Sequence, residues 1–328
     1  MNASKAAELT SLPGTQAGTD PAAAMTLVAF GEALVDQFED REVPGGAPFN
    51  VACHLAAFGA HPVLVTRTGK DAQGERLLHA MSAHGLDLRG VQCDPVRPTG
   101  LVEVHETASG HRFEIHSDQA YDHIHARMAR LVGLSVRPSI VYFGTLAQRG
   151  DSRRALRALL EATDARTFLD LNLRDPWVDA RTLRESLWQA RVTKLNEDEL
   201  ARVADLLMLD GGSLRARAAV LLSAFNLERL IVTAGAQGAW TLDAAGRFET
   251  VEGHPLEHPV DTVGAGDGFA AVCLLGMLRG WPPALQLARA DTFARAICGI
   301  RGAVPDAAAF YAPFLRDWQL DAEAPRGG

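Results

Sequence analysis

Short apolar runs alternate with amphipathic segments from Met25 onward. The apolar runs have the length of strands. We expect strands at residues 27–30, 61–65, 139–143, 167–171, 192–195 and 229–233, and helices at 49–58, 152–162 and 183–190. A further helix is expected to begin after Asp71, as its cap, and to end at Gly85. This alternation predicts an α/β fold in which a mostly parallel sheet is covered by helices on both faces.

One region departs from the alternation of strands and helices. Residues 102–105 read Val-Glu-Val-His, the turn residues Ser109 and Gly110 follow, and residues 113–115 read Phe-Glu-Ile. A period of two on both sides of a turn is typical of a β-hairpin with one face in water. We therefore expect a small β-sheet, including about residues 99–116, that projects from the main body as a lid.

The two ends of the chain differ from its middle. Residues 1–24 are rich in Ala, Thr, Ser, Gly and Pro and lack the apolar core of a secretory signal. We interpret them as a disordered extension, with a start of the protein at Met25 as the alternative. One domain is expected over residues 25–318, and a short tail over 319–328.

Composition excludes several classes of function. Hydrophobic residues make up 47% of the chain and charged residues 22%, which is an ordinary globular balance. The formal net charge of −8 argues against a broad nucleic-acid surface, which needs an extended basic patch. No apolar run reaches the roughly 20 residues of a membrane span, so we expect no membrane partner. The four cysteines are scattered without a CxxC pair, which favours a cytoplasmic protein with reduced thiols.

The segment 261–269, which reads DTVGAGDGF, carries the clearest chemistry. Its three glycines precede an apolar helical run, so the free N–H groups of the helix start would point at a bound anion. A carboxylate at Asp267 would oppose a bound phosphate unless it acts as a base on the attacking hydroxyl. The alternative is a glycine-rich turn in which Asp267 is a helix cap. The sequence contains no GxxxxGK[ST] run, which argues against a Walker-type site.

A second candidate segment begins with GEALVD at 31–36 and continues with PGGAPFN at 44–50. We expect Asp36 to follow a central strand, where α/β sheets place ligand groups. The two glycines precede a helix that has Asn50 in its first turn. Asp and Asn side chains can form paired hydrogen bonds with the vicinal hydroxyls of a sugar. The alternative is that these residues only punctuate a loop and cap a helix.

Four motifs in this order resemble the ribokinase-like (PfkB) sugar kinase family. GGAPFNVA at 45–52 resembles the N-terminal pattern of the family, and DTVGAGDGF resembles its C-terminal pattern. NEDE at 196–199 is similar to the NxxE motif, and TAGAQG at 233–238 is similar to the TxGxxG nucleotide segment. GEALVD and DLNLRDPW at 170–177 look closest to the fructokinase branch, although Leu171 replaces the proline of the usual DPNLR.

The resemblance implies a ribokinase-like fold with a β lid over the sugar, and it implies roles for individual residues. Asp267 would be the general base, and the backbone N–H groups of Gly264, Ala265 and Gly266 would form an anion hole. The sugar would be held by Asp36, Gly45, Gly46, Asn50, Arg112, Asn172 and Arg174. ATP would be contacted by Asn196, Thr233, Gly235 and Gly238. Glu199 would help to place Mg²⁺ through water, and Asp261, Val263 and Gly302 match positions that surround a monovalent cation such as K⁺.

The function implied by the resemblance is ATP-dependent phosphorylation of a sugar hydroxyl, first of all conversion of D-fructose to fructose 6-phosphate. Sibling kinases for another sugar, for a sugar acid such as 2-keto-3-deoxygluconate, or for a nucleoside are alternatives. A silent sugar- or nucleotide-binding regulator on the same fold is an alternative of another class, which the presence of Asp267 beside an intact glycine turn disfavours. Lids from two subunits are expected to pair, because the edge of the small sheet needs covering.

Other residues are interpreted as structural. Five histidines lie between residues 105 and 125, but their spacing is not typical of a closed zinc site, and we interpret them as exposed polar positions. Cys273 and Cys298 lie in apolar helical runs and are expected in the core. Trp177 and Trp281 are expected either to pack or to form pocket walls.

Overall fold

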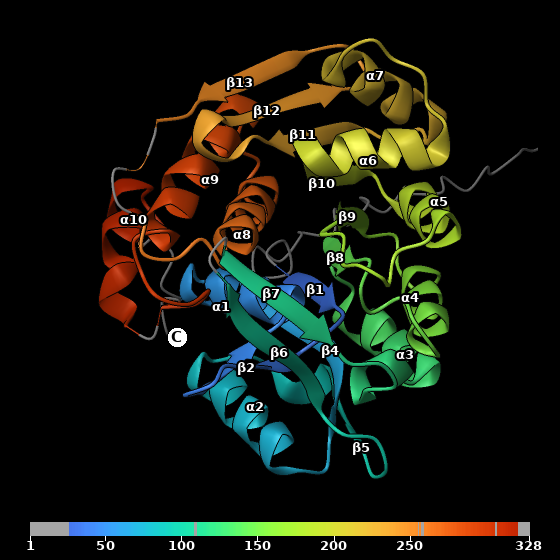
Figure 1. The fold of residues 1–328 in the computed structure, drawn as a ribbon, viewed down its shortest axis with the longest axis vertical. Helices are drawn as coiled ribbons and strands as arrows, with labels where there is room; N and C mark the ends of the chain where they lie inside the picture. Colours follow the sequence, from blue (N-terminus) through green and yellow to red (C-terminus); the bar gives the residue numbers. More distant parts are fainter. Residues whose placement is uncertain (1–25, 108–109, 255, 257–258, 306, 321–328) are drawn as a thin grey trace, which may run out of the picture.

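The computed structural model of the protein describes residues 26–107, 110–254, 256, 259–305 and 307–320. The strands of its large sheet are β1 (Thr26–Phe30), β4 (His61–Gly69), β5 (Val91–Asp94), β8 (Ile140–Gly144), β9 (Arg166–Asp170), β10 (Val192–Asn196), β11 (Arg229–Thr233), β12 (Gly238–Asp243) and β13 (Phe248–Glu252). They lie in the order β13-β12-β11-β10-β9-β8-β1-β4-β5 (Figure 1). Every pairing from β5 to β11 is parallel, whereas β12 pairs antiparallel with both β11 and β13. The predicted mostly parallel sheet is confirmed.

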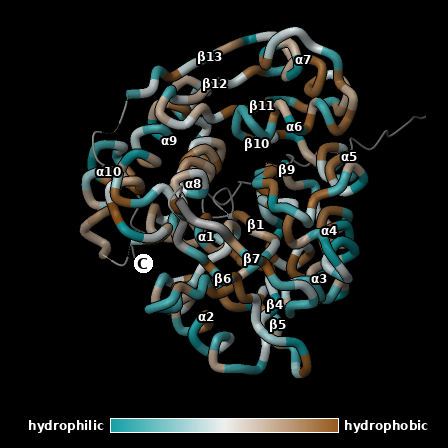
Figure 2. Tube along the Cα trace, viewed as in Figure 1, coloured by the Kyte–Doolittle hydropathy of each residue, from teal (hydrophilic) through white to brown (hydrophobic). Residues whose placement is uncertain are grey.

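Helices cover both faces of this sheet. One face is covered by α1 (Ala47–Ala57), α2 (Ala72–Ala83), α8 (Ala265–Leu278), α9 (Pro283–Ile297) and α10 (Ala312–Asp317), and the other by α3 (Ala126–Val136), α4 (Ser152–Leu160), α5 (Ala180–Gln189), α6 (Glu197–Leu207) and α7 (Leu214–Ala224). The central strand β1 shows why its sequence is continuously apolar. Leu27 and Ala29 pack into the core on the α8 side, whereas Val28 and Phe30 pack into the core on the α4 side. Figure 2 shows hydrophobic residues concentrated on the central strands and hydrophilic residues on the outer turns.

The predicted start and end of α2 are confirmed. The Asp71 side chain accepts a hydrogen bond of 2.8 Å from the backbone N–H of Gly74, as an N-cap does. Gly85 follows the helix with a φ of 70°, in the left-handed region that favours glycine. Asp71 also accepts a hydrogen bond of 2.6 Å from the Thr99 hydroxyl, which anchors the base of the lid to the main body.

The lid is a separate four-stranded sheet in the order β3-β2-β6-β7. Its strands are β2 (Leu34–Gln37), β3 (Glu42–Gly45), β6 (Gly100–Thr107) and β7 (Gly110–Ile115). The predicted hairpin is present as β6 and β7, with Val104 opposite Phe113. The sequence did not reveal β2 and β3, because each has four residues and Pro44 interrupts the pattern. Asp36 follows the central strand β1, as expected, and it lies in β2 of the lid.

The C-terminal end of the described chain packs against the body. Trp318 stacks on Phe58 at a ring separation of 5.4 Å, and Leu320 is 7% exposed. The packed chain therefore reaches at least to Leu320. The expected extension over residues 1–24 and the tail residues 321–328 lie outside the described residues. Within the described residues, no helix has the length and apolar character needed to cross a membrane.

Candidate functional site

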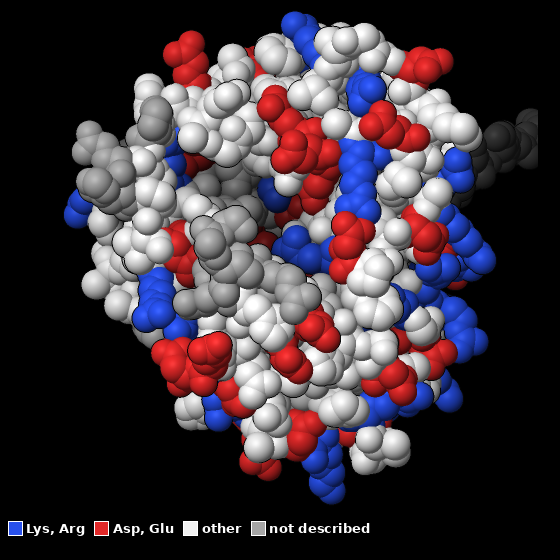
Figure 3. All heavy atoms as spheres, in the orientation of Figure 1, with Lys and Arg blue, Asp and Glu red and all other residues white. Residues whose placement is uncertain are grey.

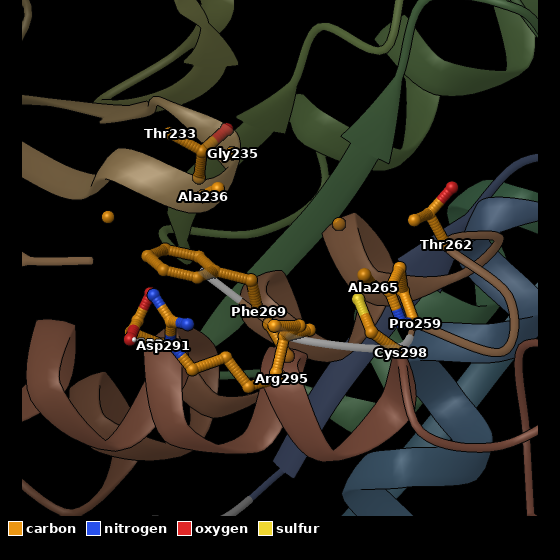
Figure 4. Close-up of a pocket in the computed structure, with 14 residues that line it drawn as sticks. Thr233, Gly235, Ala236, Pro259, Thr262, Ala265, Phe269, Asp291, Arg295 and Cys298 are labelled. Atoms are coloured by element: carbon orange, nitrogen blue, oxygen red, sulfur yellow. Dashed lines mark hydrogen bonds and ion pairs between the residues drawn. The ribbon is translucent and has the colours of Figure 1, made fainter. Parts of the chain in front are cut away.

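Two cavities meet at the N-terminus of α8. The lid cavity, of about 470 Å³, lies beneath β2, β6 and β7 and is lined by residues of α1 and by the loop after β9. The α9 cavity, of about 310 Å³, lies between the turn after β11 and helix α9 (Figure 4). Thr262 and Gly266 line both cavities. Groups bound in the two cavities can therefore meet at the first turn of α8. Figure 3 shows this face of the molecule hollowed near its centre, with both acidic and basic atoms around the hollow.

The turn before α8 needs glycine at its cap. Gly264 is the N-cap residue of α8 with a φ of 78°, in the left-handed region. A Cβ added there would lie 2.3 Å from Cβ of Ala303, so the loop around residue 303 leaves no room for a side chain. The helix begins at Ala265, whose N–H donates to the carbonyl of Thr262 at 3.3 Å, and the next residue, Gly266, lies where the two cavities join. This geometry is suited to binding an anion such as a phosphate.

Asp267 lies in the first turn of α8 and lines the lid cavity. Because Gly264 is the N-cap, the alternative interpretation of Asp267 as a cap is wrong. Its Oδ2 instead accepts a hydrogen bond of 2.8 Å from Nδ2 of Asn50, in the first turn of α1. Burial raises the pKa of Asp267, and the hydrogen bond from Asn50 and the charges of Lys194 and Arg174 counter that rise. A carboxylate so placed can accept a proton from a group in the lid cavity.

A buried ion pair that the sequence analysis did not single out lies beneath the same turn. Lys194 Nζ donates to both carboxylate oxygens of Asp170 at 2.9 Å, and the two side chains are 8% and 1% exposed. The ammonium lies 3.6 Å from the position that a Cβ on Gly266 would occupy. Burial raises the pKa of Asp170 to about 6, and the attraction of Lys194 limits the rise. A lysine within an otherwise apolar strand was the signal that could have revealed the pair.

Asp36 lies in β2, beside the paired strand β3, and lines the lid cavity. Its Oδ2 lies 2.5 Å from where a Cβ on Gly45 would be, so Gly45 leaves the space that this carboxylate occupies. Gly46, the N-cap residue of α1, has a φ of 103° and also lines the cavity. Burial raises the pKa of Asp36 to about 7, against the nearby charge of Arg174. Asp36 and Gly46 join Asn50 and Asp267 around one space, whereas Gly45 is not among the residues that line it.

The loop after β9 contributes two more predicted residues to the lid cavity. Asn172, with a φ of 40°, and Arg174 both line it. Leu171, which departs from the family pattern, is fully buried in the core, where its apolar side chain packs. The backbone of Arg112 pairs with His105 in the lid, but its side chain lies outside the described residues.

Glu32 is a residue of the lid cavity that sequence reasoning missed. It follows β1, is 4% exposed and lines the cavity together with Asp36 and Asp267. Its Oε2 has no hydrogen-bond partner in the described part of the chain. An acidic residue directly after a buried strand was the available signal. The cavity thus contains three carboxyl groups.

The α9 cavity collects three of the four predicted ATP-binding residues around apolar walls. Thr233, Gly235 and Gly238 line one side, and Phe269 lies between them and α9 (Figure 4). Gly235 and Gly238 have φ values of 56° and 98°, and a Cβ on Gly238 would lie 2.1 Å from the carbonyl oxygen of Val251. An apolar slot edged by backbone groups suits a flat heteroaromatic ring.

The two cysteines that were expected in the core differ in how deeply they are buried. Cys273 is fully buried, as predicted. Cys298 is only partly buried and lines the α9 cavity, so the prediction that it lies in the core is wrong. It follows the last residue of α9, where the apolar face of the helix ends and the chain turns along the cavity.

Asn196 and Glu199 form a reciprocal capping box at the start of α6. The backbone N–H of Glu199 donates to Asn196 Oδ1 at 2.7 Å, and that of Asn196 donates to Glu199 Oε2 at 2.9 Å. The other Glu199 oxygen accepts from the Leu173 backbone at 2.7 Å and so fixes the loop that carries Arg174. Neither residue is among those that line the two cavities. Their roles toward ATP and Mg²⁺ stay predictions.

Asp261 connects the three residues predicted to surround a monovalent cation. Its Oδ1 accepts from the backbone N–H of Val263 at 3.0 Å, and its Oδ2 from that of Gly302 at 3.2 Å. The carboxylate thus fixes the loop before α8 against the loop that covers Gly264. The cation role itself stays a prediction.

Comparisons with known proteins give consistent results. The family described as pfkB family carbohydrate kinase matches residues 21–308. Fructokinase-1 of Oryza sativa subsp. japonica is 30% identical over 312 residues, which cover 85% of this chain and 93% of that protein.

Solved structures are similar over most of this chain. A Pyrococcus horikoshii sugar kinase in complex with ATP has a TM-score of 0.69 at 25% identity, covering 84% of this chain and 93% of that one. A double mutant of Vibrio cholerae fructokinase with fructose, ADP and potassium bound has a TM-score of 0.72 at 23% identity, covering 88% of this chain and 98% of that one. The second likeness concerns the fold alone.

Proposed function

The chain belongs to the pfkB carbohydrate kinase family and is an ATP-dependent sugar kinase, and from this premise we propose that it is a fructokinase-type enzyme that phosphorylates D-fructose to fructose 6-phosphate. The observation that carries the proposal is the position of Asp267. Its carboxylate faces the lid cavity one residue after Gly266, which also borders the α9 cavity. A sugar hydroxyl beside Asp267 is then in reach of a phosphate held over the same turn.

In the proposed mechanism, the sugar lies in the lid cavity and Asp267 accepts the proton of the attacking hydroxyl. Asn50 orients that carboxylate, and Asp36, Gly45, Gly46, Asn172 and Arg174 hold the sugar. The adenine end of ATP lies in the α9 cavity, along Thr233, Gly235 and Gly238, with Asn196 nearby. Positioning and charge stabilisation of this kind account for most of the catalysis of phosphoryl transfer.

The negative charge that develops on the phosphate is stabilised by the first turn of α8. The backbone N–H groups of Gly264, Ala265 and Gly266 supply fixed donors. Lys194, beneath Gly266, adds a positive charge in a buried environment, where charges interact strongly. The lid excludes water, which would otherwise hydrolyse ATP.

Metal ions complete the proposed site. Among the described residues, no cluster of three or more His, Cys, Asp or Glu side chains is arranged to hold a metal ion alone. This fits Mg²⁺, which prefers phosphate oxygens, water and one or two carboxylates and would neutralise phosphate charge when bound. Glu199 would reach it through water. Asp261, Val263 and Gly302 would hold K⁺, the ion named for the Vibrio cholerae relative.

A kinase for a sugar acid is the second candidate function, because Arg174 lines the lid cavity and could pair with a carboxylate. An ADP-release assay with D-fructose, D-ribose, 2-keto-3-deoxygluconate and a nucleoside separates these candidates. We expect the highest kcat/KM with D-fructose. A higher value with the sugar acid would contradict the fructokinase assignment.

We also propose a cytoplasmic homodimer formed through the lids. Strand β7 is the outer strand of the lid sheet, and an edge strand is a position where a strand of a second copy can add to the sheet. All four cysteines are free, which suits a reducing compartment. Light scattering at micromolar concentration tests the dimer, and a monomer there would contradict it.

A further inference from the structure

Glu32 lines the lid cavity and has a buried carboxylate oxygen without a hydrogen-bond partner among the described residues. That oxygen is Oε2. A buried polar atom without a partner is costly, so one in a residue that lines a binding cavity indicates a ligand group that would satisfy it.

The two arginines near Glu32 donate hydrogen bonds to other groups. Arg149 donates to Asp122 at 2.8 and 3.0 Å and to the hydroxyl of Tyr121 at 2.6 Å. Arg174 donates to the carbonyl of Leu173 at 3.4 Å. Both guanidinium groups lower the pKa of Glu32 only partly, because burial, the largest effect, raises it to about 7. Neither arginine therefore explains the buried carboxyl as a structural ion pair.

The surrounding backbone is shaped to hold Glu32. A Cβ on Gly46 would lie 2.6 Å from the carbonyl oxygen of Glu32 and 3.3 Å from its Cγ. The glycine at the start of α1 therefore lets Glu32 lie directly under the predicted sugar contacts. Glu32, Asp36 and Asp267 give the cavity three carboxyl groups, against the single described guanidinium of Arg174.

We propose that Glu32 is a specificity-determining residue of the sugar site, where its Oε2 accepts a hydrogen bond from a hydroxyl of a neutral sugar and its charge disfavours a sugar that carries a carboxylate. This inference rests on the proposed function. A neutral sugar presents hydroxyl donors to the three carboxyl groups, whereas a sugar acid brings a further negative charge among them. Rejection by an unfavourable charge is a common source of specificity.

The test compares Glu32→Gln and Glu32→Asp with the wild-type enzyme, using D-fructose and 2-keto-3-deoxygluconate. Glu32→Gln keeps the shape and removes the charge. We expect its KM for fructose to rise about tenfold or more, as for a lost hydrogen bond to a charged group, with a smaller change in kcat. The ratio of kcat/KM for the sugar acid to that for fructose should rise by a similar factor.

Glu32→Asp separates the hydrogen bond to fructose from the charge effect on the sugar acid, because it keeps the charge and shortens the side chain. It should raise the KM for fructose while still rejecting the sugar acid. Glu185→Gln is the matched control, since Glu185 pairs with Arg181 on α5 and is not among the residues of either cavity. It should leave both KM values unchanged.

A binding measurement distinguishes sugar recognition from a structural role. Fructose should raise the melting temperature of the wild-type enzyme and of Glu185→Gln more than that of Glu32→Gln, while ATP should raise all three equally. Equal fructose shifts together with an unchanged selectivity ratio would overturn the inference.

The inference and the proposed function fail in different ways. A wild-type enzyme that phosphorylates another neutral sugar better than fructose contradicts only the fructokinase assignment, and Glu32→Gln is then expected to raise the KM for that sugar. A wild-type enzyme that prefers the sugar acid contradicts both.

Discussion

Asn50 donates a hydrogen bond of 2.8 Å from Nδ2 to Oδ2 of Asp267, across 217 residues of sequence. The bond joins the first turns of α1 and α8 and fixes one oxygen of the carboxylate. Oδ1 of Asn50 is buried without a partner among the described residues, so it is available to a hydroxyl in the lid cavity. Asn50 can therefore contact the sugar and orient the base together.

Replacing Asn50 by alanine should shift the pH dependence of the reaction. The hydrogen bond from Asn50 stabilises the ionised form of Asp267 and lowers its pKa. Its loss should raise that pKa, so the acidic limb of the kcat profile should move to higher pH. Steady-state assays across pH with saturating sugar and ATP measure this shift. An acidic limb at the wild-type position would show that Asn50 does not act through Asp267.

Asp36→Asn should weaken sugar binding and flatten the pH dependence of stability. Burial raises the pKa of Asp36 to about 7 in the folded protein, well above the ordinary value of an aspartate. A raised pKa of an acid favours folding below the unfolded value, and this contribution is lost as pH rises through about 7. Between about pH 5.5 and pH 8 the wild-type enzyme should lose about 1–3 kcal/mol of unfolding free energy that the variant keeps.

Denaturant unfolding at both pH values and the KM for fructose check this prediction. The variant should show a smaller loss of unfolding free energy together with a raised KM. Parallel pH dependence in both proteins would mean that Asp36 titrates normally in the free enzyme.

The stability of the protein should depend strongly on whether Lys194 and Asp170 are both present. Lys194→Met leaves a buried carboxylate unpaired, which typically costs about 3–5 kcal/mol of stability. Adding Asp170→Asn should recover much of this stability, because the uncompensated charge is gone. Activity should stay low in the double variant, because the positive charge beneath Gly266 is still missing. Recovery of kcat along with stability would assign the pair a structural role alone.

Local patterns allowed much of the fold and site to be predicted from the sequence. The turn before α8 was predicted because three glycines lie just before an apolar run, although the helix already begins at Ala265. The parallel sheet followed from buried strands such as β1, which are apolar on both faces. In both cases the determining residues are neighbours in the chain.

Residues whose role depends on distant partners were not predicted. Glu32 and the ion pair of Lys194 and Asp170 matter because folding brings them beneath Gly46 and Gly266. Asn196 and Glu199 differ, because they belong to a local motif and their spacing is explained by a local capping box. The position of Asp36 in the lid sheet was not predicted, because the lid pairs β2 with β6, about 65 residues later.

The central claim is that Asp267 is the general base of phosphoryl transfer, and Asp267→Asn tests it most directly. The substitution keeps the shape and removes the proton acceptor, and general base catalysis typically contributes about 10²–10⁴ in rate. The measurement is kcat with saturating D-fructose and ATP, together with the dissociation constants of both. We expect kcat to fall at least about a hundredfold, with both substrates bound nearly as tightly as by the wild-type enzyme. A kcat close to that of the wild-type enzyme would contradict the mechanism and leave the turn before α8 as an anion-binding site without a base.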